Sequence, residues 1–187
     1  MKKYVWPSVK LTLVFILLCS VLYPLLIAGI AKFSTGGGKG ETVEVNGKVV
    51  GYANIGQKFT EDKYFWSRPS AVDYNAAGSA GSNKAPSNPE YLKQVQERID
   101  SFLVHNTGVK KEEIPAELVT ASGSGLDPDL SPYAAKVQAK RIATVRKVDE
   151  ATIIDLIDKQ TEKPLLGFMG PAKVNVLKLN IELDKLK

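Results

Sequence analysis

Few residues of this chain combine a type and a spacing that suit catalysis. The run Ser122-Gly123-Ser124-Gly125 is similar to a nucleophile elbow, in which a serine lies on a sharp turn and attacks a carbonyl carbon. That motif requires glycine where Ser122 stands, so the match is incomplete. A membrane-anchored serine hydrolase that uses Ser122 or Ser124 therefore stays an alternative interpretation.

Bases and metal ligands are equally sparse. His105 is the single histidine, so a hydrolase would have to activate its serine with His105 or with a lysine such as Lys136. Asp127 and Asp129 are close in sequence but lack the other ligands of a calcium loop. We expect no catalytic residue and no metal site in this chain.

A glycine-rich run, residues 36–40, suggests a phosphate loop but does not have its spacing. The loop motif needs glycine, four residues, and then Gly-Lys-Ser/Thr. Here Gly38-Lys39 is followed by Gly40, and position 33 is a phenylalanine. The composition instead predicts a flexible linker over residues 32–42.

An uncharged stretch, residues 11–31, determines whether the rest of the chain is attached to a membrane. A hydrocarbon core about 30 Å thick requires about 20 apolar residues of helix, so this stretch is long enough to span a membrane. The apolar part of a cleaved signal is about 7–15 residues, which favours a permanent anchor. The other interpretation, a cleaved signal, would leave a freely secreted binding protein that begins after Ala31.

The orientation of the span follows from a small excess of lysines on its N-terminal side. We expect residues 1–10 in the cytoplasm and residues 43–187 outside it. Within the span, Pro24, which follows Tyr23, has no N–H to donate to the helix, and Ala28 and Gly29 are small enough for another helix to approach. These four residues are the predicted contacts with a membrane partner, although membrane helices often carry Pro and Gly without one.

Composition limits what the rest of the chain can do. The formal charge is +5, and three of these charges lie before the span, so the remainder is too weakly basic for a nucleic-acid-binding surface. Cys19, the one cysteine, lies in the span, which excludes an intramolecular disulfide. Residues 43–187 have the length of one ordinary domain.

Periodicity predicts an α+β fold for this domain, after one N-terminal transmembrane helix. Asn46-Gly47 between valines indicates a β-hairpin, and residues 62–88 indicate a long loop. Helices are expected between Pro89 and Gly108, from Ser131 to about Arg146, and after Asp149. Residues 173–181 alternate apolar and polar side chains, which predicts a final strand that pairs with the first.

Several longer strings, in this order, carry a resemblance to a known family. They are Tyr23-Pro24-Leu25-Leu26, YFWSRPSA (residues 64–71), LVTASGSGLDP (118–128) and VNVLKLNIELD (174–184). The chain resembles the C subunit of the bacterial potassium-transporting P-type ATPase, the Kdp complex, over nearly its whole length.

The resemblance implies a non-catalytic accessory subunit in the bacterial inner membrane. Its partners would be a channel-like subunit that binds potassium, a P-type subunit that hydrolyses ATP, and the lipid bilayer. It would support assembly and act as a catalytic chaperone that promotes ATP binding by the pump subunit. ATP and K⁺ would be handled by the complex, and this chain would bind no cofactor of its own. The alternative is a membrane-anchored extracytoplasmic binding module.

The aromatic and Gly/Ser-rich loops are the expected docking surfaces of the soluble domain. Their predicted contact residues are Tyr64, Phe65, Trp66, Arg68, Ser122, Gly123, Ser124, Gly125 and Asp127. Alternatively, Phe65 and Trp66 belong to the core, and Gly123 and Gly125 only form turns.

Overall fold

The computed structural model describes residues 2–186. They fall into two compact units, divided between Thr42 and Val43. We describe each unit separately, and we call the second unit the body.

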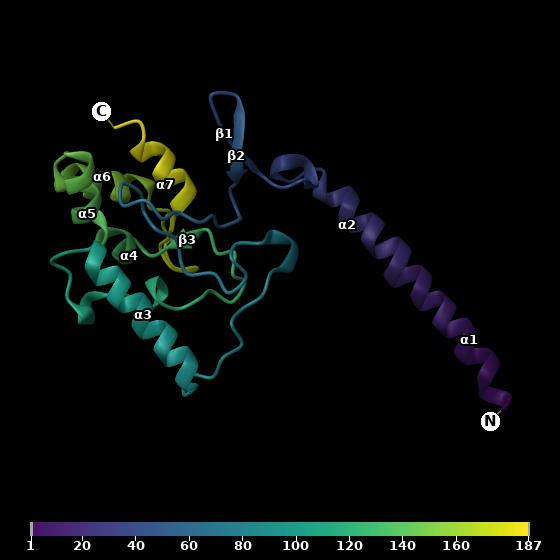
Figure 1. The fold of residues 1–187 in the computed structure, drawn as a ribbon. Coiled ribbons are helices and arrows are strands. Elements are labelled where there is room, and N and C mark those ends of the chain that lie inside the picture. Colours follow the sequence, from purple (N-terminus) through teal and green to yellow (C-terminus); the bar gives the residue numbers. More distant parts are fainter. Residues whose placement is uncertain (1, 187) are drawn as a thin grey trace. The chain divides into compact units, whose positions relative to one another are not determined.

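The first unit is dominated by one unbroken helical rod (Figure 1). It consists of α1 (Lys2–Ile16), a π-helical turn (Leu17–Leu22) and α2 (Tyr23–Ala31). Residues 3–31 are long and apolar enough to cross a membrane. A short 3₁₀ turn, Thr35–Gly38, follows within the predicted linker.

The body begins with the predicted hairpin. Strands β1 (Thr42–Val45) and β2 (Lys48–Tyr52) form a two-stranded sheet. Asn46 and Gly47 connect them with φ angles of 53° and 75°. Two consecutive positive φ angles give the turn whose twist matches paired strands, which is why Asn-Gly indicates a hairpin.

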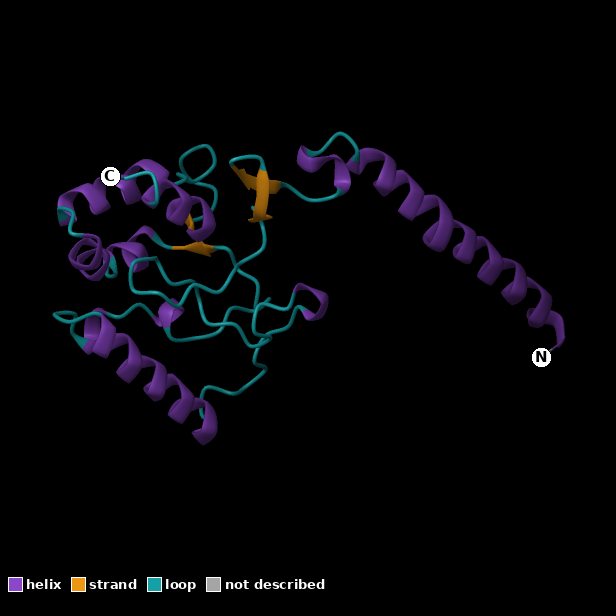
Figure 2. Ribbon diagram, turned by 45° about the horizontal axis from the view of Figure 1, so that its top comes forward, coloured by secondary structure: helices purple, strands orange, loops and turns teal. Residues whose placement is uncertain are grey.

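Helices make up most of the regular structure of this α+β domain, and loops connect them over long stretches (Figure 2). The helices are α3 (Pro89–His105), α4 (Pro132–Lys136), α5 (Ala139–Arg146), α6 (Glu150–Gln160) and α7 (Val176–Leu183). Short 3₁₀ turns occur at Ala76–Gly78, Lys111–Glu113 and Ala116–Leu118.

The predicted helix starts are correct because each is set by a local cap. The side chains of Asn88, Ser131 and Asp149 each accept a hydrogen bond from a backbone N–H in the first turn of α3, α4 and α6. The expectation of one helix from Ser131 to Arg146 was wrong, since α4 and α5 are separated at residues 137–138.

The predicted strand at residues 173–181 was also wrong. Only Val174–Asn175 forms a strand, β4, and the side chain of Asn175 then caps α7 by accepting a bond from Lys178 N–H. Strand β4 pairs antiparallel with β3 (Asp129–Leu130), not with the first strand. The apolar residues after Asn175 suit a helix as well as a strand, and the cap selects the helix.

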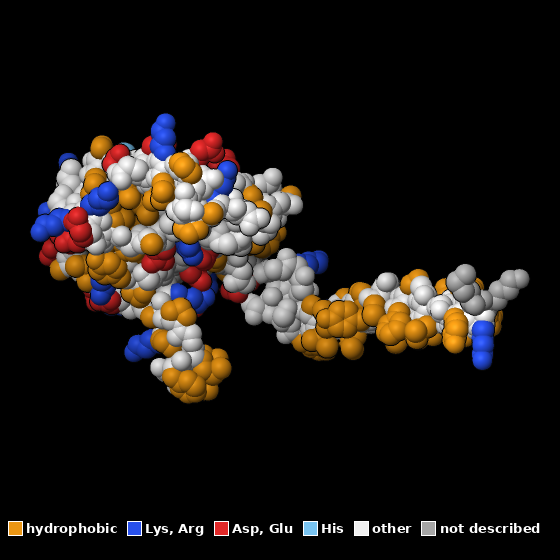
Figure 3. Space-filling view, turned by 90° about the horizontal axis from the view of Figure 1, so that it is seen from below, with side chains coloured by type: hydrophobic (Ala, Val, Ile, Leu, Met, Phe, Trp, Pro, Cys, Tyr) orange, Lys and Arg blue, Asp and Glu red, His pale blue; other side chains and the backbone are white. Residues whose placement is uncertain are grey.

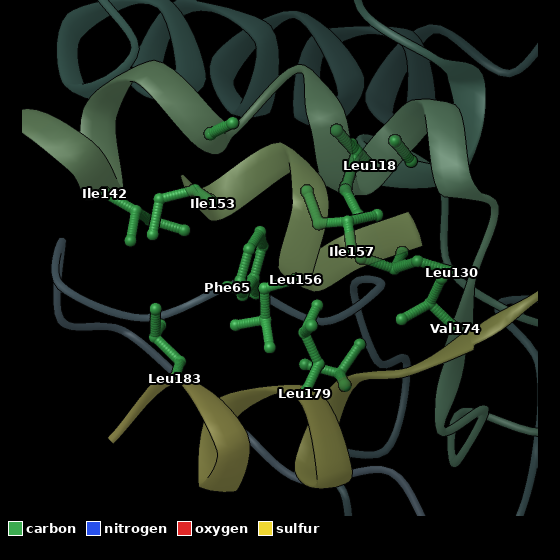
Figure 4. Close-up of a cluster of buried hydrophobic side chains, with 14 of the residues drawn as sticks. Phe65, Leu118, Leu130, Ile142, Ile153, Leu156, Ile157, Val174, Leu179 and Leu183 are labelled. Atoms are coloured by element: carbon green, nitrogen blue, oxygen red, sulfur yellow. The ribbon is translucent and has the colours of Figure 1, made fainter. Parts of the chain in front are cut away.

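The core of the body surrounds Phe65, which is completely buried. Its ring lies among side chains of α6 and α7, including Leu156, Ile157, Leu179 and Leu183 (Figure 4). Burial of large apolar side chains is the main stabilising contribution. This core fixes the loop that carries four of the predicted contact residues, Tyr64, Phe65, Trp66 and Arg68.

Candidate functional site

The candidate site is built on residues 63–66, a segment outside the described strands whose backbone groups bond mainly to side chains. Phe65 N–H donates to Asn180 Oδ1 at 2.9 Å, and Asn180 Nδ2 donates back to Phe65 O at 3.0 Å. Gln138 makes the same pair of bonds with Trp66, at 2.8 and 3.3 Å. Two buried amides thus take the place of a neighbouring strand for a chain that no sheet includes.

Two arginines hold the beginning of this segment, at Lys63 and Tyr64. Arg141 Nη2 donates to Tyr64 O at 2.8 Å, and Arg146 Nε donates to Lys63 O at 2.8 Å. Arg146 also forms an ion pair with Asp184 at 2.6 Å, and Asp184 accepts a bond from the Tyr64 hydroxyl at 2.9 Å. Burial, together with this hydrogen bond, raises the pKa of Tyr64.

Arg141 is the most constrained charge in the body. Burial lowers its pKa to about 10, with Asp62 acting in the opposite direction. Its guanidinium carbon lies 4.0 Å from the centre of the Trp66 ring, so a cation–π contact replaces part of its lost hydration. Its Nε and Nη1 atoms have no hydrogen-bond partner among the described residues. At neutral pH this side chain stays charged and holds Trp66 in place.

The other neighbours of Trp66 complete an aromatic cluster at the end of α3. Its ring centroid lies 5.0 Å from that of His105 and 6.3 Å from that of Phe102, both at steep angles. His105 Nδ1 lies 2.8 Å from Asp62 Oδ1. The single histidine is therefore tied to a carboxylate and a tryptophan, which gives it a structural role.

A groove of about 660 Å³ lies between residues 58–74 and α3. Trp66, Tyr74, Phe102 and His105 are among its lining residues. Burial raises the pKa of Tyr74 to about 12. This groove could not be predicted from the sequence, because its walls come from segments that are distant in the chain.

The two predicted docking loops are brought together by one ion pair. Arg68 Nη1 lies 2.9 Å from Asp127 Oδ2, and both side chains are only partly exposed. Asp127 Oδ1 accepts a bond from Asp129 N–H, which fixes the turn. The Tyr74 hydroxyl donates to Arg68 O. The structure thus joins residues 68–74 to residues 120–128, as parts of one surface.

Glycines permit the close packing of these loops. Gly125 has a φ of +68°, and a Cβ there would lie 2.7 Å from Val72 Cγ2 and 2.8 Å from Ala80 O. Gly123 has open space around it, and Ser124 is exposed. Gly125 is therefore required by the turn and by the packing, whereas Gly123 is not.

The predicted contact residues differ in how exposed they are to a partner. Phe65 and Ser122 are buried, so their side chains serve the interior. Tyr64, Trp66 and Arg68 are half-buried. Contact with a partner stays a prediction for those three residues, for Asp127, and for the exposed Gly123 and Ser124.

The groups needed for a serine hydrolase are engaged elsewhere. Ser122 is 3% exposed, and Ser124 Oγ accepts a bond from Leu126 N–H. Lys136 forms an ion pair with Asp158 at 2.7 Å, while His105 binds Asp62. Among the described interactions, no base contacts either serine.

The two aspartates considered for cation binding also have protein partners. Asp127 pairs with Arg68, and Asp129 pairs with Lys173 at 2.8 Å. The Asp129 hydrogen bond raises the pKa of Lys173. Each carboxylate is therefore already neutralised by a cation. Within residues 2–186 no group of three or more potential metal ligands occurs.

In the span, the structure places Tyr23 and Pro24 at the end of the π turn. Tyr23 N–H donates to Leu18 O, five residues earlier, and Pro24 has no N–H to donate. Nothing lies within 4 Å of a Cβ built at Gly29. Tyr23, Pro24, Ala28 and Gly29 are all exposed along the rod, so their predicted contact with a partner helix would have to be made by another chain.

One exposed feature was not predicted from the sequence: a run of large apolar residues between α6 and β4. Leu165, Leu166, Phe168 and Met169 are all more than half exposed. Pro164 and Gly167 lie within this run. The available signal was the absence of any polar side chain between Lys163 and Lys173.

Comparison with known proteins places this geometry in context. The family model described as "K+-transporting ATPase, c chain" (KdpC) matches residues 5–185. A potassium-transporting ATPase KdpC subunit from Flavobacterium psychrophilum is 57% identical over 99% of this chain and 100% of its own length. KdpC subunits from Bacteroides fragilis and Bacillus cereus are 54% and 43% identical. Each covers 96% of this chain, over 96% and 94% of their own lengths.

Proposed function

This chain belongs to the KdpC family of potassium-transporting ATPase subunits, and from that premise we propose that it is a non-catalytic accessory subunit. It stabilises the assembled pump and promotes ATP binding by the subunit that hydrolyses ATP. Its partners are that subunit and a channel-like subunit that binds potassium.

One observation carries the non-catalytic assignment: the groups that could do chemistry are used for structure. Lys136 and Asp127 each form an ion pair with an oppositely charged side chain, and His105 contacts the carboxylate of Asp62. Ser122 is buried in the packed loops. A domain whose reactive side chains are committed to its own architecture suits a binding role better than a catalytic one.

The proposed location places the span in the inner membrane, with the N-terminus inside and the body outside the cytoplasm. The body would then lie on the side opposite to the nucleotide. Its effect on ATP binding would be a coupling free energy between separate sites, transmitted through the partner subunits. A contact of the exposed membrane helix with a partner helix is the simplest route for such coupling.

Assembly and nucleotide affinity can be tested together. The complex is purified after co-expression with the partner genes, with this chain either complete or lacking residues 1–31. We expect loss of assembly, or a raised KM for ATP in the potassium-stimulated ATPase reaction, when the span is missing. Full assembly with an unchanged KM would contradict the proposal.

The side of the membrane requires a separate measurement. In right-side-out vesicles, an added protease should cut the body without permeabilisation. Protection of the body until the vesicles are opened would place it inside and would permit direct contact with nucleotide.

A further inference from the structure

Residues 161–173, between α6 and β4, fold back on themselves as a projection that we call the apolar finger. At its base, Glu162 and Lys173 form an antiparallel bridge, with N–H to O distances of 2.8 and 3.1 Å. Nearer the tip, Leu165 and Met169 form a second bridge. Two bridges make the finger a defined structure.

The tip of the apolar finger presents only apolar side chains. Residues 164–172 contain no polar side chain. Leu166 and Phe168 are 76% and 79% exposed, and Leu165 and Met169 are 68% and 51% exposed. The space-filling view shows hydrophobic side chains gathered at the end of a projection from the body (Figure 3). Such a cluster, rimmed by polar residues, marks an interaction site.

The backbone of the tip satisfies much of its own hydrogen bonding. Gly167 N–H donates to Pro164 O at 2.9 Å, and Met169 N–H donates to Leu165 O at 2.9 Å. Leu165 N–H donates to Met169 O at 3.0 Å in return. Internal pairing of this kind is what a backbone requires before it enters lipid, where water cannot take over the bonds.

Charges lie at the base of the finger and not at its tip. Lys163 and Lys173 bound the apolar run on both sides. Lys173 is held at the base by Asp129 at 2.8 Å and by Glu162 at 3.6 Å. Lysines flanking an apolar segment keep their ammonium groups in water or among lipid headgroups while the segment is buried.

The tether limits how far the body can move from the bilayer. The linker, residues 32–42, can extend at most roughly 40 Å, at about 3.6 Å per residue. A surface held so close meets the membrane at a high effective concentration, so weak insertion is enough for occupancy. The tip has none of the Trp, Tyr or Arg residues that dominate the binding energy of protein–protein interfaces, although its Phe168 and Met169 are also common there, so a protein partner is the outcome that the test must distinguish.

We propose that the tip of the apolar finger, residues 165–169, inserts into the lipid–water interface of the membrane that carries the α1–α2 rod. This second contact would limit the rotation of the body on its linker. The inference goes beyond the proposed function and rests only on its membrane anchoring. Assembly of the pump and its KM for ATP do not depend on it.

The test uses the full chain with Cys19→Ser, so that one introduced cysteine carries an environment-sensitive fluorophore. Phe168→Cys reports on the tip, and Val104→Cys, on α3 and 73% exposed, is the matched control. The labelled proteins are reconstituted without partner subunits in vesicles of phosphatidylethanolamine and phosphatidylglycerol. Emission is measured with a lipid-borne nitroxide quencher and with iodide in the water.

We expect the lipid-borne quencher to reduce emission several-fold more at position 168 than at position 104, and iodide to do the reverse. The same measurement with Met169→Cys keeps Phe168 in place and should agree. Equal iodide quenching at the tip and at the control position would overturn the proposal. Protection of the tip only in the assembled pump would also overturn it, because the occupant would then be a partner subunit.

Discussion

The side-chain amide of Asn180 pairs with both backbone polar groups of Phe65, accepting from N–H at 2.9 Å and donating to the carbonyl at 3.0 Å. The two residues are 115 positions apart in the chain. This pair joins α7 to the segment that carries the central core residue.

Asn180→Ala should therefore destabilise the body strongly. It leaves two buried backbone groups of Phe65 without partners, and each costs about 1–3 kcal/mol. We expect the free energy of unfolding to fall by about 3 kcal/mol. Urea titration of the full chain in detergent, followed by Trp66 fluorescence in a Trp6→Phe background, measures this. Thr107→Ala, at an exposed site, should change little; an equal loss there would refute the assignment.

Gly125→Ala and Gly123→Ala form a matched pair. The first adds a Cβ at a positive φ and 2.8 Å from Ala80 O, while the second adds one in open space. We expect Gly125→Ala to cost about 2 kcal/mol or more and to speed proteolysis after Lys84, with Gly123→Ala near wild type. Denaturation and limited trypsin digestion give both quantities. Similar behaviour of the two variants would show that the loops do not need this close packing.

Arg68 and Asp127 should be energetically coupled. A double-mutant cycle with Arg68→Ala and Asp127→Ala is expected to give a coupling of about 1 kcal/mol, at the upper end for a partly exposed pair. The coupling should shrink in high salt, because screening weakens the attraction. Two single losses that simply add would mean that the ion pair contributes nothing.

Tyr74 should make stability depend on pH in the alkaline range. Burial raises its folded pKa to about 12, whereas an unfolded tyrosine titrates near 10. The neutral phenol therefore contributes its full stabilisation below about pH 10, and this is lost as pH rises toward about 12. Tyr74→Phe lacks the contribution, so the stability difference between wild type and variant should narrow above about pH 10. A difference that stays constant across this range would contradict the burial of the hydroxyl.

Gly29→Leu tests the predicted helix contact in the membrane. A leucine there would prevent the close approach that a glycine allows. We expect several-fold lower recovery of the partner subunits when this chain is purified, with Ile30→Leu as the volume-conserving control. Undiminished recovery with Gly29→Leu would place the contact elsewhere on the rod.

Local signals explain which parts of the fold were predictable. The Asn46-Gly47 turn and the caps at Asn88, Ser131 and Asp149 act within a few residues, so the sequence predicts them directly. After Val174, strand and helix periodicities overlap, and the cap formed by Asn175 decides between them. The structure alone reveals the pairing of Phe65 with Asn180, because no local pattern connects two residues so far apart.

The candidate site was predictable only in part, for the same reason. The sequence predicted Arg68 and Asp127 as contact residues on two separate loops. Only the folded chain shows that their side chains form an ion pair. The apolar finger was not predicted, because apolar residues such as Leu166 and Phe168 are normally buried and the sequence does not show that these two stay exposed.

The side-chain bonding of residues 63–66 has a consequence for self-association. A strand bonded to another strand can slip by two residues or accept a strand from a second molecule, because any backbone satisfies it. Here the side chains of Gln138 and Asn180 occupy the polar groups of Phe65 and Trp66, and each amide fits one position only. These four backbone groups are therefore already bonded within the domain, which leaves them less available to pair with a strand of a second molecule.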